Sequence, residues 1–256
     1  MIPVAVRESG LPEGLVAIPV RTRLIAPNDD LAALVGDAIR GIAQPGDVVA
    51  IAETGVAIAQ SRFIAAESIR PSPLALALSR RADPMATVSQ PESLQLVIDQ
   101  VGTRKVLWAA VAHVFGRLRG RRGAFYEILG EAIAAIDGYT GTMPPYERAI
   151  VLGPAEPDRV ATELADALGV HVAIVDANDL RRAKALGASP HLDRAAVERA
   201  LLSNPGGNGD EQTPIVILTW RAPGPNPLIV RHNASPSPSS LATPPNVTLS
   251  LSKGER

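Results

Sequence analysis

Short β-branched runs along this chain alternate with stretches in which apolar residues recur at helical spacing. Residues 15–25 (LVAIPVRTRLI) and 48–54 (VVAIAET) are rich in valine and isoleucine, which predicts two strands. Between them, apolar residues follow helical spacing from Leu31 to Ile39, after the turn and cap residues of 27–30 (PNDD). Two strands joined through a helix predict a crossover unit.

The same alternation returns in the second half of the chain. The predicted elements are strands at 147–153 (ERAIVLG), 170–176 (VHVAIVD) and 213–220 (TPIVILTW), and helices at 156–168 and 193–201. The run 170–176 is almost wholly apolar, as expected of a strand buried on both faces. Together these elements predict a mixed α/β or α+β fold, with mixed sheets and flanking helices.

The middle of the chain has a less regular pattern. Prolines interrupt residues 61–88, which predicts a long loop with a short helix. Residues 89–100 begin with Ser-Gln-Pro-Glu, typical of a helix start, and Gly102 ends that helix. The apolar run at 105–115 (KVLWAAVAHVF) predicts a strand or a buried hairpin arm.

The last part of the chain differs in composition from the rest. Residues 232–256 are rich in serine and proline and have little apolar surface to bury, which predicts a disordered tail. We therefore expect residues 1–231 to form one folded domain.

Composition excludes several classes of function. The chain has 256 residues and no cysteine, which excludes disulfides, thiolate zinc sites and a cysteine nucleophile. The net charge of −1 gives no electrostatic reason to expect a nucleic-acid partner. The start lacks the pattern of a signal peptide, and no apolar run is long enough to span a membrane. We therefore expect a cytoplasmic protein with no membrane partner.

Two aspartates follow apolar segments and are candidate metal ligands. Asp176 ends the buried run 170–176, and strand ends are where ligands collect in α/β sheets. Asp137 lies in AAIDGYTG, and two converging carboxylates together with nucleotide phosphates hold Mg²⁺ well. The structural alternatives are a helix cap formed by Asp176, Asn178 or Asp179, and an Asp-Gly turn at position 137.

The basic segment GRLRGRRG (116–123) is the candidate phosphate site. Its guanidinium groups match phosphate oxygens, and its glycines allow close approach of the backbone. The alternative is a solvated surface loop. Tyrosines near Asp137 (126, 139 and 146) could stack on a ring, although core packing is the simpler role. The arginines of the segment (GRLRGRRG, 116–123) are Arg117, Arg119, Arg121 and Arg122.

Three segments of the sequence resemble the coenzyme F420-0:L-glutamate ligase family. IPVRTRLIAPNDDLAALVGDAIRGIAQPGDVVAIAET (18–54) is similar to its opening strand, helix and second strand. AAIDGYTG (134–141) and VAIVDANDL (172–180) stand where the family has two metal-binding aspartate segments. The likeness extends over roughly residues 15–220.

The resemblance implies a mixed α/β fold, a homodimer, and the use of GTP with Mg²⁺ or Mn²⁺. It implies that Asp137 and Asp176 bind the metal. The implied reaction joins a phospholactate-flavin precursor to the amine of L-glutamate through an acyl phosphate. The expected partners are therefore a small-molecule substrate and a nucleotide.

The sequence also departs from the family pattern. Glu53 stands where the family usually has glutamine, and AETGVAIAQSR (52–62) lacks the two lysines of that segment. The basic stretch near 116–123 is unlike the family, and Arg119, Arg121 and Arg122 are candidates to replace the missing cations. Two functions stay open, a GTP- and metal-dependent amide ligase and a non-catalytic protein that binds a nucleotide or flavin precursor. A purely structural domain is the third reading.

Overall fold

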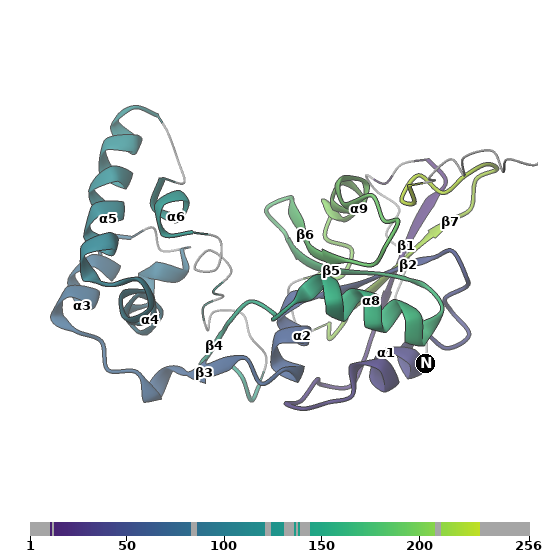
Figure 1. The fold of residues 1–256 in the computed structure, drawn as a ribbon, viewed down its shortest axis with the longest axis horizontal. Coiled ribbons are helices and arrows are strands. Elements are labelled where there is room, and N and C mark those ends of the chain that lie inside the picture. The colour runs from purple at the N-terminus through teal and green to yellow at the C-terminus, as the bar shows by residue number, and fades with distance from the viewer. Residues whose placement is uncertain are drawn as a thin grey trace, which may run out of the picture.

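The fold is described from a computed structural model, which covers residues 11, 13–82, 86–120, 124–130, 136, 138, 144–207 and 211–230 (Figure 1). The strands are β1 (Leu15–Val20), β2 (Val48–Ala52), β3 (Phe63–Ala65), β4 (Ala149–Val151), β5 (His171–Asn178), β6 (Arg182–Ala188) and β7 (Ile215–Trp220). The α-helices are α1 (Leu31–Ile39), α2 (Glu53–Ala59), α3 (Pro73–Ser79), α4 (Pro91–Val101), α5 (Thr103–Leu118), α6 (Ala124–Leu129), α8 (Pro157–Leu168) and α9 (Arg194–Leu201). Two short 3₁₀ helices are η1 (Ala66–Ser68) and η2 (Thr87–Ser89).

The main sheet has five strands in the order β1-β7-β2-β5-β6. β2 and β5 are parallel neighbours, and every other neighbouring pair is antiparallel. As a result β1, β2 and β5 run in one direction, while β7 and β6 run in the other. The sequence prediction of a mixed α/β fold with mixed sheets is confirmed.

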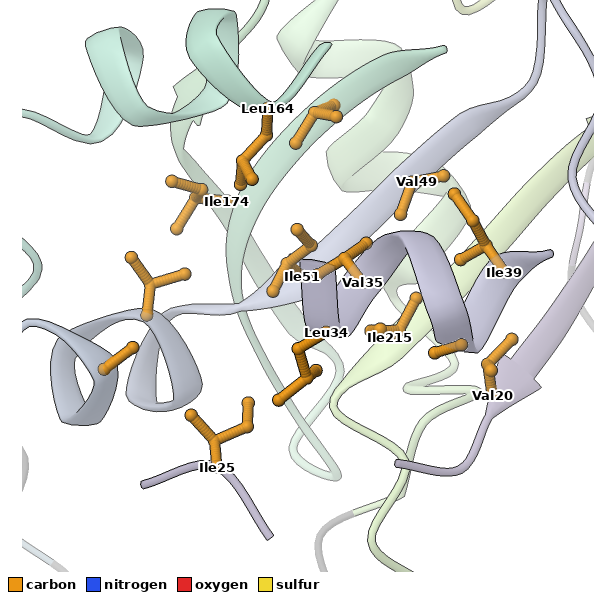
Figure 2. Close-up of a cluster of buried hydrophobic side chains, with 14 of the residues drawn as sticks. Val20, Ile25, Leu34, Val35, Ile39, Val49, Ile51, Leu164, Ile174 and Ile215 are labelled. Carbon is orange, nitrogen blue, oxygen red and sulfur yellow. The ribbon is translucent and has the colours of Figure 1, made fainter. Parts of the chain in front are cut away.

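Helices cover both faces of this sheet. On one face, α1, α2 and α8 pack over the isoleucines at the centre of β2, β5 and β7, which are fully buried (Figure 2). On the other face, α9 packs against β5 and β6, and its Val197 and Leu201 belong to one buried cluster with Val48 and Leu218. The two apolar faces explain why β2 is apolar at every position and why β5 is apolar from Val172 to Val175. The central isoleucines are Ile51, Ile174 and Ile215.

A separate helical lobe is inserted between β3 and β4. These two strands pair antiparallel, with Phe63 opposite Val151 and Ala65 opposite Ala149. All of η1, α3, η2, α4, α5 and α6 lie between them in the sequence, and Figure 1 shows α3, α4, α5 and α6 gathered away from the main sheet. The lobe has its own apolar core, which includes Val97 and Val106.

The predicted strand at 105–115 is wrong, because this segment belongs to α5. Val106 and Ala109 are buried while Leu107 and Trp108 are exposed, which is the pattern of a helix and not of an alternating strand. The run is rich in valine, and a short apolar run cannot be assigned to strand or helix by periodicity alone.

Other boundaries also shift. The strand predicted at 15–25 ends at Val20, and the strand predicted at 48–54 ends at Ala52, where α2 begins without a break. The predicted cap of α1 is confirmed, since the Asp30 side chain accepts a hydrogen bond from the Ala33 N–H at 3.1 Å. In the described part of the chain, no helix has the length and apolar character needed to cross a membrane. The predicted tail at 232–256 lies outside the described residues.

Candidate functional site

The candidate site lies at the edge of the main sheet where the parallel strands end. β1 ends there at Val20 and β2 ends at Ala52, while the antiparallel strand β7 begins there at Ile215. β5 extends past its neighbour β2, so that Asp176 follows Val175, the partner of Ala52. In open α/β sheets this edge is the usual place for ligands, because loops there can surround a small molecule.

Asp176 is part of a strand and does not cap a helix. β5 continues through Asn178 and turns directly into β6, so the predicted cap at Asp176, Asn178 or Asp179 is wrong. The Asn178 carboxamide oxygen accepts from the Leu180 N–H at 3.1 Å and shapes the turn. Asp179 accepts a hydrogen bond from the buried Asn204 side chain at 2.7 Å, which ties the turn to the chain after α9.

Lys184 is the cation that the fold places beside Asp176. The two residues are register partners in the β5–β6 hairpin, and Arg182 is likewise the partner of Asn178. Partners in an antiparallel pair point to the same face of the sheet. Asp176, Lys184 and Arg182 are all exposed, so this face of the hairpin offers one carboxylate and two cations to a ligand.

A β-bulge sets this arrangement. Ile174 pairs with Gly187, but the next residue, Val175, pairs with Ala185, so that β6 accommodates Leu186 as an extra residue. Without the bulge, Asp176 would oppose Ala185 and the lysine would point to the opposite face.

Side chains from α8 and α9 hold the bulge in place. The Glu198 carboxylate accepts from the Ala185 N–H at 3.0 Å, and Arg194 Nη1 donates to the carbonyls of Ala185 and Leu186 at 3.4 Å each. Arg194 also forms an ion pair with Asp158, and Asp158 accepts from the Ala188 N–H at 2.9 Å. The local geometry of β6 is therefore fixed by groups outside the hairpin.

The electrostatic environment of Asp176 favours a nearby cation. Partial desolvation by the surrounding protein raises the pKa of this carboxyl above its ordinary value, although solvent reaches the side chain. The positive charge of Lys184 acts in the opposite direction and lowers the pKa. A bound divalent cation would stabilise the ionised form in the same way.

Glu53 is a second carboxylate at this edge. It directly follows Ala52, and the parallel register of β2 and β5 therefore places Glu53 and Asp176 at adjacent strand ends. Its Oε2 atom is buried. Reasoning from the sequence did not select Glu53 as a site residue. The sequence signal that could have indicated it is the same as for Asp176, an acidic residue directly after an apolar run.

Asp137 lies outside the described residues, so its predicted convergence with Asp176 stays a prediction. Its neighbours are described. Ile136 is buried in the core of the helical lobe. A Cβ on Gly138 would lie 2.3 Å from the side-chain oxygen of Gln90, so a larger residue here would require the Gln90 side chain to shift. Among the described residues, no group of three or more His, Asp or Glu side chains is arranged to hold a metal ion.

The predicted arginine site is only partly described. Arg119 is exposed just beyond the end of α5 in the helical lobe, whereas Asp176 belongs to the main sheet. Arg121 and Arg122 lie outside the described residues. Tyr146 is buried in the core, which agrees with the core-packing role expected for the tyrosines. Its ring lies edge to face with Phe63, with 5.4 Å between the ring centroids.

The segment that lacks the family's lysines forms α2. Residues 55–59 are all buried, with Val56 and Ile58 in the core of the main sheet. A Cβ on Gly55 would lie 2.7 Å from Ile25 Cδ1. This side of α2 therefore packs against the protein and offers no cation to a ligand.

Comparison with known protein families identifies one that matches most of the described chain. A family model described as F420-0:Gamma-glutamyl ligase matches residues 19–179, which run from β1 to the turn after Asp176. The chain belongs to the F420-0:gamma-glutamyl ligase family. The match ends within the β5–β6 turn, so β6, Lys184 and β7 lie beyond the matched region.

A curated relative supports this assignment. The chain is 29% identical over 170 residues to the coenzyme F420:L-glutamate ligase of Methanopyrus kandleri. The aligned region covers 65% of this chain and 60% of that relative. The family assignment confirms the resemblance drawn from the three sequence segments.

Proposed function

We propose that this protein is an amide ligase that joins the amine of L-glutamate, or of a similar amino acid, to a carboxylate on a small molecule. The observation that carries the proposal is Asp176, which lies at the carboxyl edge of the sheet beside Glu53 and opposite Lys184. Family membership supports the same reaction class.

The chemistry proposed for this edge has two steps. The γ-phosphoryl group of GTP passes to the substrate carboxylate, which gives an acyl phosphate and GDP. The amine of glutamate then attacks the acyl carbon, loses a proton and releases phosphate as the amide bond forms. Negative charge on phosphate oxygens must be neutralised in both steps.

The residues at the edge fit a divalent cation such as Mg²⁺ or Mn²⁺. Asp176 would hold it, with Glu53 at the adjacent strand end and Asp137 as the predicted further ligand. Carboxylate oxygens are the ligands these cations prefer, and a bound cation neutralises phosphate charge. Lys184 and Arg182 are placed to bind phosphate oxygens, so they offer a replacement for the family's missing lysines.

The second candidate is a protein that binds the nucleotide or flavin precursor without ligation. The burial of α2 favours it, because residues 55–59 supply no cation where the family has lysines. The two functions differ in turnover, since only the ligase consumes GTP when glutamate and an acceptor are present.

The first experiment compares thermal unfolding with and without GTP, each with and without Mn²⁺. A ligand at about 100 times its Kd adds about 2.7 kcal/mol to stability. For a protein of this size, this is a rise in Tm of about 5–10 °C. We expect a rise that needs both GTP and Mn²⁺, and that Asp176→Asn abolishes.

The matched control is Asp166→Asn, which changes an exposed carboxylate on α8. It should keep the full rise in Tm. Loss of the rise in both variants, or in neither, would contradict the assignment of Asp176. Glutamate-dependent formation of GDP then separates the ligase from the binding protein.

A further inference from the structure

One side of α5 presents large apolar side chains to solvent. Trp108 is 64% exposed and Phe115 is 55% exposed. Three further apolar residues, Leu107, Val111 and Val114, are exposed, and Val111 lies three or four residues from each of the other four. All five side chains therefore lie on one side of the helix, while Val106 and Ala109 pack inward. We name this surface the α5 ridge; its residues are Leu107, Trp108, Val111, Val114 and Phe115.

The charged residues of α5 itself and of the two residues after it have one sign. The whole chain has 25 lysines and arginines against 26 aspartates and glutamates. Residues 103–120 contain four basic residues and no acidic residue. Arg104 near the start of α5 and Arg119 just beyond its end are both exposed, so the apolar ridge has a cation at each end.

This charge pattern disfavours a second copy of the chain as the partner. If two α5 helices packed antiparallel, Arg119 of each copy would approach Arg104 of the other. A parallel pair would place identical arginines side by side. Either arrangement brings like charges together at a contact that excludes water, which costs free energy.

The position of α5 and the side chains of the α5 ridge together fit a lipid surface. α5 lies at the end of the helical lobe, away from the main sheet (Figure 1). An exposed helix surface that carries Trp108 and Phe115, with an exposed arginine near each end of the helix, has the side chains that bind the interface of an anionic bilayer.

We propose that the α5 ridge docks this protein on an anionic lipid surface. The apolar side chains enter the boundary between headgroups and acyl chains, and the arginines pair with lipid phosphates. The sequence expectation of no membrane partner rested on the lack of a spanning segment. A helix lying in the interface needs no such segment. The proposal does not depend on the reaction at the sheet edge.

The test measures co-sedimentation of the full chain with vesicles. We expect binding to vesicles of equal parts phosphatidylglycerol and phosphatidylcholine, and about tenfold weaker binding to phosphatidylcholine alone. In a Trp220→Phe background, Trp108 is the sole tryptophan and its emission should shift to shorter wavelength on binding. The double variant Trp108→Ser, Phe115→Ser should bind at least tenfold more weakly.

Matched controls separate docking through the α5 ridge from nonspecific adsorption to vesicles. Leu180→Ser removes an apolar side chain that is 66% exposed in the β5–β6 turn, and it should bind like the wild type. Arg104→Glu with Arg119→Glu should weaken binding at least tenfold, while Arg40→Glu with Arg199→Glu should change it little.

Three results would overturn the proposal. One is equal or absent binding to both kinds of vesicle. Another is unchanged binding by the Trp108 and Phe115 double variant. The third is a dimer in gel filtration that this variant dissociates and Leu180→Ser does not, because the α5 ridge would then be covered by a second copy.

Discussion

Lys184 lies opposite Asp176 because β6 carries one extra residue, Leu186, in its pairing with β5. The bulge turns the lysine onto the face that carries the aspartate, and Glu198 and Arg194 hold the bulge from α9. A carboxylate and a cation on one face can together bind a metal–phosphate complex. The charge pair at the sheet edge is thus a product of strand register.

Replacing Lys184 by glutamine should weaken binding of GTP with Mn²⁺. A hydrogen bond to a charged group contributes about 1.5–3 kcal/mol, so we expect at least a tenfold rise in Kd, measured by titration calorimetry. The control is Arg40→Gln, which removes an exposed cation at the C-terminal end of α1, paired with Asp37 at 2.5 Å. A wild-type Kd in the Lys184 variant would show that this lysine does not contact the nucleotide.

Gly187→Ala should destabilise the protein strongly. An added Cβ would lie 2.3 Å from the backbone of Pro157 at the start of α8, and the backbone cannot move aside as a side-chain end can. We expect a loss of about 2–3 kcal/mol in the free energy of unfolding, measured in urea. Gly36→Ala in α1 is the control, since its Cβ would meet only the tip of Leu168 at 3.1 Å. An equal effect of both substitutions would contradict this account.

Tyr146→Phe should cost about 1–2 kcal/mol of stability. The buried hydroxyl donates to the Ile25 carbonyl at 3.2 Å, and its removal leaves a buried acceptor without that donor. The ring contact with Phe63 is kept. Thr162→Val removes an exposed hydroxyl bond to the Asp158 carbonyl and should cost less than about 0.5 kcal/mol. Urea unfolding of both variants measures the difference, and a Tyr146 effect no larger than that of Thr162 would contradict the prediction.

Asp29 should contribute to loss of stability in acid. Hydrogen bonds from Arg23 at 2.6 and 2.9 Å, and then from the Ala26 N–H, hold the pKa of this carboxyl below its ordinary 3.8. A lowered carboxyl pKa adds stability that is present above the unfolded pKa and is lost as pH falls through the folded pKa. Asp29→Asn should therefore lose less stability than the wild type as pH falls below about 4.

The measurement is urea unfolding across the acid range. A wild-type slope in Asp29→Asn would show that the pair with Arg23 adds nothing in the folded state.

Local sequence signals predicted most elements of the main sheet. Apolar runs marked β2, β5 and β7, and Asp30 and Asp193 marked the starts of α1 and α9, where each accepts a backbone hydrogen bond. β6 was missed because RAKALGA contains only small and charged residues besides one leucine. Its strand form comes from pairing with β5 and from contacts with α8 and α9, which the local sequence does not encode.

The site was predicted in part for the same reason. Asp176 could be selected because it ends an apolar run. Lys184 could not be selected, because its position depends on a bulge fixed by Glu198 and Arg194 from a later helix. Glu53 required the parallel register between β2 and β5, which joins segments more than a hundred residues apart.

The short pair of β3 and β4 also bears on how this protein is built. Ala65 and Ala149 are direct partners, so the helical lobe leaves and re-enters the rest of the chain at a single point. In topological terms the lobe is an oversized hairpin connection. Its length and surface can therefore diverge, or be exchanged for a tight turn in an engineered chain, while the strand order of the main sheet stays the same.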